Sequence, residues 1–239
     1  MKAPSLFVLE FKKLSPALLA FVVLGFTGLP FLLTEVFVVF KRSALSGQPV
    51  ELVVSNNVGS WSALLYPLLV IVLTQSVVDV ERQGNLLLYG KSYRRTWVGF
   101  YGRKVAVVFT LLTLVTLLNV LFNGLLVWSV TGFMVAKDAG AMIVSASLDF
   151  LAVLLAFIPM ICFHLTIALV VRKPGVAYLV GILLVILGIP IINLTDLVVN
   201  PYSFGIAALK PGIDYLAIAA SGAIITVMSC YAAIWRLKK

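Results

Sequence analysis

An uncharged stretch in the middle of the chain, VAVVFTLLTLVTLLNVLFNGLLVWSVT at residues 105–131, decides the class of fold. A helix needs about 20 mostly apolar residues to cross the hydrocarbon core of a bilayer, and this stretch is longer than that. Similar stretches occupy residues 15–40, 58–78, 147–171, 175–195 and 213–235. The sequence therefore predicts an all-α polytopic membrane protein, a single transmembrane domain over residues 1–239 with six spans.

The composition of the whole chain excludes a soluble globule. Hydrophobic residues make up 62% of it and charged residues only 11%, and the mean hydropathy is +1.13. In a soluble domain about a quarter of all residues are charged. The formal net charge is +9, but the basic residues lie between the apolar runs. They therefore indicate topology and contact with lipid headgroups, and we expect no nucleic acid as a partner.

The distribution of Lys and Arg predicts the orientation in the membrane, because cytoplasmic loops are enriched in these residues. With the N-terminus inside, all but four of the 18 basic residues fall in cytoplasmic segments; the exceptions are Lys41, Arg42, Lys137 and Lys210. We expect a multi-pass protein of the cell (plasma) membrane with both termini in the cytoplasm. The first apolar run is too long for a signal peptide and has no good cleavage site, so we expect an uncleaved first span.

Residues 2–13 precede the first span and form an amphipathic segment. Leu6, Phe7 and Phe11 are apolar, whereas Glu10 and Lys13 are charged. This pattern predicts an interfacial helix lying in the headgroup plane, with an unstructured N-terminus as the alternative.

The segment at 79–104, between the second and third spans, is the longest predicted cytoplasmic loop. It holds six of the 18 basic residues and five aromatic residues, and acidic residues lead it. Residues 81–89 are expected to form a short helix across the cytoplasmic face, which leaves Arg94 and Arg95 to pair with acidic groups of a partner. A membrane anchor of positive charges and aromatic rings is the alternative. That alternative does not explain the length of the loop or its leading acids.

Residues 85–92 nearly match the nucleotide-binding pattern G-x-x-x-x-G-K-[ST], but Asn85 replaces the first glycine. The pattern also requires a preceding strand in an α/β sheet, for which this chain has no room. We therefore expect that the chain is not an enzyme and binds no cofactor, and that a partner subunit handles ATP and Mg. Cys162, Cys230 and the single histidine have no metal-ligand spacing, so no metal site is expected.

At this loop the chain resembles the membrane subunits of type-2 ABC exporters, the ABC-2 permeases. Such permeases have an N-terminal interfacial helix, six spans, cytoplasmic termini and a loop between spans two and three that begins with an acid and a glycine. The resemblance departs from the usual pattern at Asn85, where Thr is common, and at Ser92-Tyr93, where a Pro is often found. Residues 200–204 and Pro211 resemble the family's short non-spanning hairpin. The positions that carry the resemblance are Glu81, Gly84, Leu88, Arg94, Arg95 and Lys104.

The resemblance implies that a cytoplasmic coupling helix in this loop docks on a separate ABC ATPase. The expected function is the permease subunit of an ATP-driven exporter of a peptide, lipid-like or antibiotic substrate, as in bacterial antibiotic resistance or immunity. Expected partners are cytoplasmic ABC ATPase subunits, a second permease copy or a related permease, and membrane lipid. The candidate coupling residues are Glu81, Arg82, Gly84, Asn85, Leu88, Tyr89, Lys91, Arg94, Arg95 and Lys104.

Ionisable and irregular positions within the spans are candidates for the transport pathway, because such groups are costly in lipid. Glu35 and Asp149 lie near the outer ends of spans, where headgroup-level carboxylates are the alternative. His164 is either a buried imidazole bonded across helices or a proton relay. Pro190 frees a backbone carbonyl that must be satisfied, so we expect this stretch, which includes Asn193, inside the bundle.

Two other classes of function remain open. A self-contained ion-coupled secondary transporter needs carboxylates near the midplane, and the middle thirds of the six runs hold none. An intramembrane enzyme or a non-transporting scaffold is the third class. The chain has neither H-E-x-x-H nor G-x-S-x-G, which leaves an enzyme few groups to use.

Overall fold

The computed structural model describes residues 10–83, 97–131, 134, 138–171, 173–195, 199–210, 212 and 214–238. Residues 2–9 of the predicted interfacial helix lie outside this part, as does Pro211. The coupling helix predicted at 81–89 lies outside it beyond Gln83. The same holds for seven of the ten candidate coupling residues: Gly84, Asn85, Leu88, Tyr89, Lys91, Arg94 and Arg95.

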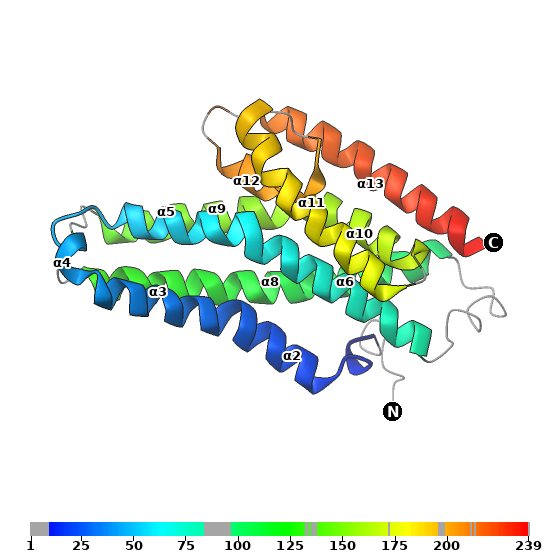
Figure 1. Cartoon of the computed structure of the whole chain (residues 1–239), viewed down its shortest axis with the longest axis horizontal. Helices are drawn as coiled ribbons and strands as arrows, with labels where there is room; N and C mark the ends of the chain where they lie inside the picture. The colour runs from blue at the N-terminus through cyan, green and yellow to red at the C-terminus, as the bar shows by residue number, and fades with distance from the viewer. Residues whose placement is uncertain are drawn as a thin grey trace.

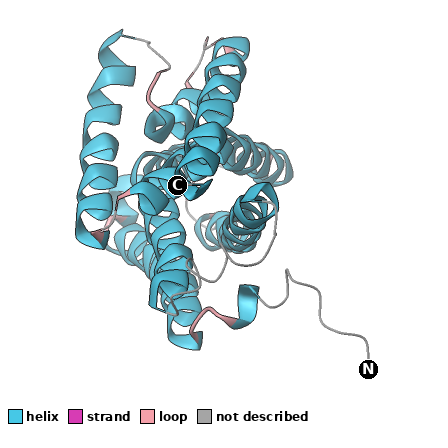
Figure 2. Cartoon of the chain, turned by 90° about the vertical axis from the view of Figure 1, so that its right-hand side faces the viewer, coloured by secondary structure: helices cyan, strands magenta, loops and turns pink. Residues whose placement is uncertain are grey.

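Six helical stretches in the described part of the chain are long and apolar enough to cross a membrane (Figure 1). Their number confirms the sequence prediction. The stretches are Pro16–Phe40, Glu51–Gln83, Val98–Val130, Ala139–Val170, Pro174–Ile192 and Tyr215–Arg236. In the view along the bundle, helices account for nearly all of the described chain and loops are short (Figure 2).

Proline positions explain why three of these spans are interrupted. The first consists of α2 (Pro16–Val23), a π-helical turn and α3 (Leu29–Phe40), and the second of α5 (Glu51–Ser60), a π-helical turn and α6 (Tyr66–Gln83). Each π turn ends two residues before a proline, Pro30 or Pro67, whose missing N–H disrupts the regular bonding pattern.

The fourth span is divided in the same way. A turn at Phe157, two residues before Pro159, separates α9 (Ala139–Ala156) from α10 (Ile158–Val170). The third span is the continuous helix α8 (Trp97–Val130). The remaining elements are α4 (Arg42–Leu45), α11 (Pro174–Thr195), η3 (Pro201–Ser203), α12 (Phe204–Leu209) and α13 (Tyr215–Lys238).

The second and fourth spans begin earlier than the sequence predicts, at Glu51 and Ala139 instead of residues 58 and 147. Polar residues such as Glu51, Asn56 and Asn57 lower the hydropathy of the first turns of α5 without breaking the helix. Since α5 packs on α9, tertiary contacts extend both helices beyond their most apolar parts.

The core of the bundle lies where α6, α8 and α10 meet. These helices contact one another, and large side chains such as Tyr66, Leu112 and Phe157 are fully buried there. We call the end where α6, α10 and α13 finish and α2, α8 and α11 begin the terminal end, at the right in Figure 1, and the other the far end. The first and sixth spans are peripheral and expose large apolar side chains, as lipid-facing helices do.

The stretch around Pro190 lies only partly inside the bundle: its neighbours Gly188 and Ile192 are buried, but the other face of the helix is not. Pro190 is exposed, and α11 is a peripheral helix with exposed Leu183 and Leu187. The segment that follows the helix supplies donors to two of its backbone carbonyls. Asn200 Nδ2 donates to the carbonyl of Leu184 (2.9 Å), and Lys210 Nζ donates to that of Ile192 (3.1 Å). The last candidate in this helix, Asn193, has a side chain outside the described part of the structure.

Candidate functional site

Four charged side chains meet in a buried ion cluster at the terminal end of the bundle: Glu10, Lys13, Glu81 and Lys104. Lys104 Nζ lies 2.5 Å from Glu81 Oε1 and also pairs with Glu10 Oε2. Lys13 Nζ lies 2.8 Å from Glu81 Oε1 and 3.3 Å from Glu10 Oε1. The Glu81 side chain is only 3% exposed and that of Lys104 only 2%. Two carboxylates and two ammonium groups therefore balance one another in a site largely shielded from solvent.

Three segments of the chain supply this cluster. Glu10 and Lys13 are three residues apart in the segment before α2, Glu81 lies in the last turn of α6, and Lys104 lies near the start of α8. Buried charges persist where they are paired, and removing one partner leaves the others uncompensated. The cluster thus fixes the segment before the first span to the two helix ends that flank residues 84–96.

The electrostatics of the cluster favour charged side chains. Burial lowers the pKa of Lys13, but hydrogen bonds and attraction from the Glu81 and Glu10 carboxylates outweigh burial, so that its pKa is raised. Lys104 also has its ammonium group 5.4 Å from the centre of the Phe100 ring, within the range of cation–π attraction.

Arg82, the next residue of α6, has a different set of partners, at the end of α10. Its Nη1 lies 3.3 Å from Asp79 Oδ1, while Nη2 donates to the carbonyls of Val171 (2.6 Å) and Ala168. The last carbonyls of a helix have no intrahelical partner and carry partial negative charge. Arg82 therefore caps the end of α10 and fixes it to α6.

The structure describes three of the candidate coupling residues. Glu81, Arg82 and Lys104 have side chains directed into contacts within the chain, and they join the ends of α6 and α8 to the rest of the bundle. Their part in coupling stays a prediction. Sequence reasoning missed Glu10 and Lys13 as members of the same cluster. Their opposite charges three residues apart could have indicated that the two side chains pair on one face of a helix.

The pathway candidates do not meet. Glu35 accepts hydrogen bonds from Ser129 Oγ (3.0 and 3.2 Å) near the far end, whereas Asp149 is exposed on α9. His164 is fully buried, and its Nδ1 lies 2.5 Å from the hydroxyl of Tyr202. Among the contacts described, none joins these three candidates, and their part in a pathway stays a prediction. The imidazole is bonded across helices, as one of the two sequence interpretations expects.

A row of uncharged polar side chains between α5, α6 and α8 was not predicted. Asn57 Nδ2 donates to Asn123 Oδ1 (3.0 Å), Asn123 Nδ2 donates to the carbonyl of Asn119 (2.9 Å), and Tyr66 bonds to Thr116. In the sequence, residues 116, 119 and 123 recur at helical spacing, which was the available signal. Because these groups satisfy one another, the row holds three helices together in an apolar environment.

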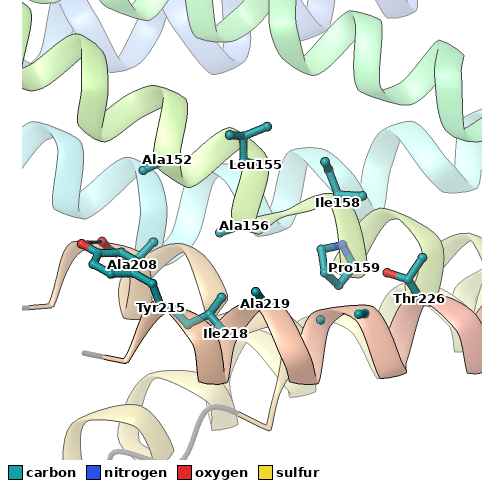
Figure 3. Close-up of a pocket in the computed structure, with 12 residues that line it drawn as sticks. Ala152, Leu155, Ala156, Ile158, Pro159, Ala208, Tyr215, Ile218, Ala219 and Thr226 are labelled. Atoms are coloured by element: carbon teal, nitrogen blue, oxygen red, sulfur yellow. Dashed lines mark hydrogen bonds between the residues drawn. The ribbon is translucent and has the colours of Figure 1, made fainter.

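An apolar groove of about 450 Å³ lies between α9, α10 and α13 (Figure 3). Leu155, Ile158 and Pro159 line it from α9 and α10, and Ile218 and Ala219 line it from α13, with Pro159 directed toward α13 in the figure. The hydroxyls of Tyr215 and Thr226 are its polar groups. This chemistry suits a hydrocarbon chain and offers nothing that would hold a metal. In the described residues, no group of three His, Cys, Asp or Glu side chains gathers at any place.

The fold and the cluster together define a class, a polytopic α-helical membrane protein with the ends of its first three spans joined by buried charges. Comparisons with protein-family models, curated proteins and solved structures find no match to the chain.

Proposed function

We propose that the chain is the membrane-spanning permease subunit of an ATP-driven transporter of the ABC-2 kind, worked by a separate cytoplasmic ATPase. The proposed substrate is a peptide, lipid-like or antibiotic molecule that is exported. The proposed assembly holds two ATPase subunits and two permeases, either two copies of this chain or this chain and a related one. The resemblance at residues 81–104 and the six apolar helices support this proposal.

The buried ion cluster is the observation that carries the proposal. A force applied to residues 84–96 by an ATPase reaches the membrane only if both ends of that loop are firmly held. Glu81 and Lys104, at its two ends, are paired with each other and with the segment before the first span. A push on the loop would therefore move three spans together. Nucleotide binding by the ATPase would then bias the bundle between two conformations through this contact.

The test is co-purification with the ATPase subunit and stimulation of its activity in liposomes. We expect the wild-type chain to bind an ATPase and to change its rate of ATP hydrolysis. Glu81→Gln should retain binding, because the loop remains, but lose the stimulation, because one end of the loop is released. Glu51→Gln, an exposed carboxylate at the far end, is the matched control and should behave as wild type. If the intact chain recovers no ATPase while hydrolysis is otherwise preserved, the proposal is wrong.

The alternative is a self-contained ion-coupled secondary transporter, and the fully buried pair of His164 and Tyr202 is the observation in its favour. A carrier of this kind moves substrate in liposomes without any ATPase. Replacing Glu35, Asp149 and His164 together should then abolish gradient-driven uptake. Unchanged uptake by that triple variant would exclude ion coupling through these groups.

A further inference from the structure

Two buried polar atoms near the middle of the bundle have no hydrogen-bond partner among the described residues: Nε2 of His164 and Oε1 of Gln75. Both residues are 0% exposed. An unpaired polar group in an apolar interior costs about 1–3 kcal/mol, so each of these atoms requires an explanation.

The register of the two helices places the two side chains at the same level. α6 and α10 belong to the second and fourth spans, which run in the same direction, and the Arg82–Val171 hydrogen bond fixes one helix against the other. Gln75 precedes Arg82 by seven residues, and His164 precedes Val171 by seven. Seven residues are close to two helical turns, so Gln75 and His164 lie at a similar level, each about 10 Å along its helix from the end that this bond joins.

Helix α11 closes this position from a third side. A Cβ atom added at Gly181 would lie 2.7 Å from Cε1 of His164 and 2.8 Å from Cδ1 of Ile71. Ile71 is one turn before Gln75 on α6, and Cε1 is the ring atom that lies between the two nitrogens. This edge of the imidazole, which Nε2 shares with Nδ1, therefore lies where α6, α10 and α11 meet.

The known partners of both side chains are consistent with one assignment of donor and acceptor, which we adopt here. The hydroxyl of Tyr202 has Nδ1 of His164 as its partner, and its proton is satisfied if it donates to that nitrogen. The imidazole then carries its proton on Nε2. Gln75 Nε2 donates to Asp79 Oδ1 (3.0 Å), which fixes the amide so that Oε1 remains as an acceptor. A donor and an acceptor thus lie at one level without bonding to each other.

We propose that Nε2 of His164 and Oε1 of Gln75 bind one buried water molecule between α6 and α10. Water accepts from the imidazole N–H and donates to the amide oxygen, which gives it the two polar partners that a buried water needs. It also closes a hydrogen-bonded line that runs from Tyr202 through His164, Gln75 and Asp79 to Arg82. The segment after α11 is thereby connected to the terminal end of the bundle. This inference does not rest on the proposed transport function.

The test uses the fact that His164 is the single histidine of the chain. Histidine labelled with nitrogen-15 gives solid-state NMR signals from this ring alone, with the intact chain in phosphatidylcholine liposomes. We expect a protonated Nε2, an unprotonated Nδ1, and a cross-peak from Nε2 to protons at the water frequency. A protonated Nε2 with no transfer from water, or one in direct contact with the Gln75 amide, would overturn the proposal.

Variants separate a specific water from general hydration. Gln75→Leu removes the acceptor and should lose the water cross-peak, whereas Gln83→Leu, an exposed glutamine of the same helix, should keep it. Tyr202→Phe should change the Nδ1 signal and leave the water cross-peak in place. Persistence of that cross-peak in Gln75→Leu would contradict the proposal. If Gln75→Leu does not fold, the shorter amide of Gln75→Asn provides the same test, with loss of the cross-peak expected.

Discussion

At the scale of single residues, the four charges of the buried ion cluster depend on one another. Lys104 is the residue that pairs with both carboxylates from the deepest position. Its removal leaves Glu10 and Glu81 close together with Lys13 as their remaining partner in the cluster. The cost of breaking a buried ion pair on one side is about 3–5 kcal/mol.

We therefore predict that Lys104→Met lowers the free energy of unfolding by about 3–5 kcal/mol, measured by SDS titration from a mild detergent. Lys12→Met is the matched control, because Lys12 is exposed, and it should change stability by less than about 0.5 kcal/mol. Equal effects of the two substitutions would show that the cluster contributes no stability.

The contacts of individual side chains were the part of the structure that the sequence predicted least well. Glu81 and Lys104 were recognised from the sequence as candidate positions of the coupling loop, but not as partners of each other. Their pairing with each other depends on how two spans pack at their ends, which no spacing along one helix reveals. His164 and Tyr202 are separated by 38 residues, so their contact too is a consequence of tertiary structure.

At the scale of elements, the close packing of α11 on α6 and α10 depends on the absence of a side chain at Gly181. Gly175 lies on the same helix, and a Cβ added there would meet nothing within 4 Å. The two glycines therefore form a matched pair that differs in its surroundings.

We predict that Gly181→Ala destabilises the protein by about 1–3 kcal/mol, because the new methyl group forces His164 and Ile71 to move. Gly175→Ala should be neutral or stabilising by up to about 1 kcal/mol, because alanine has the higher helix propensity. Thermal unfolding followed by circular dichroism measures both. A stabilising Gly181→Ala would mean that α11 packs less closely than described.

The elements themselves were largely predictable, because runs of apolar residues encode spanning helices directly. The predictions failed where tertiary contacts, and not hydropathy, decide where a helix begins or how deeply it is buried. α5 begins at polar Glu51 because it packs on α9. The helix around Pro190 is held to the bundle on one face, where Asn200 and Lys210 donate to the carbonyls of Leu184 and Ile192.

At the scale of the whole molecule, the orientation in the membrane is a prediction from the basic residues. Exposed Ser46 lies beyond the first span, and exposed Lys173 lies between the fourth and fifth spans, so the two positions should be on opposite sides. With Cys230 replaced by Ser and Cys162 buried, a cysteine introduced at either position can be labelled selectively.

We predict that a membrane-impermeant maleimide labels Ser46→Cys in intact cells and labels Lys173→Cys only after the membrane is permeabilised. This result follows from the bias of Lys and Arg toward cytoplasmic segments. The reversed pattern would place both termini outside the cytoplasm, and equal labelling of both would contradict the predicted number of crossings between them.

The unequal lengths of the spans have a practical consequence. The second, third and fourth spans have 33, 33 and 32 residues, whereas the fifth has 19. At 1.5 Å per residue the longer ones measure about 50 Å, which exceeds the roughly 30 Å of the hydrocarbon core. Their surplus, which includes polar α5, extends at the far end beyond α11 and α13 (Figure 1). This projecting far end offers a site to which an antibody fragment can bind. A bound fragment provides the feature outside the detergent micelle that aligning images of a small membrane protein in electron microscopy requires.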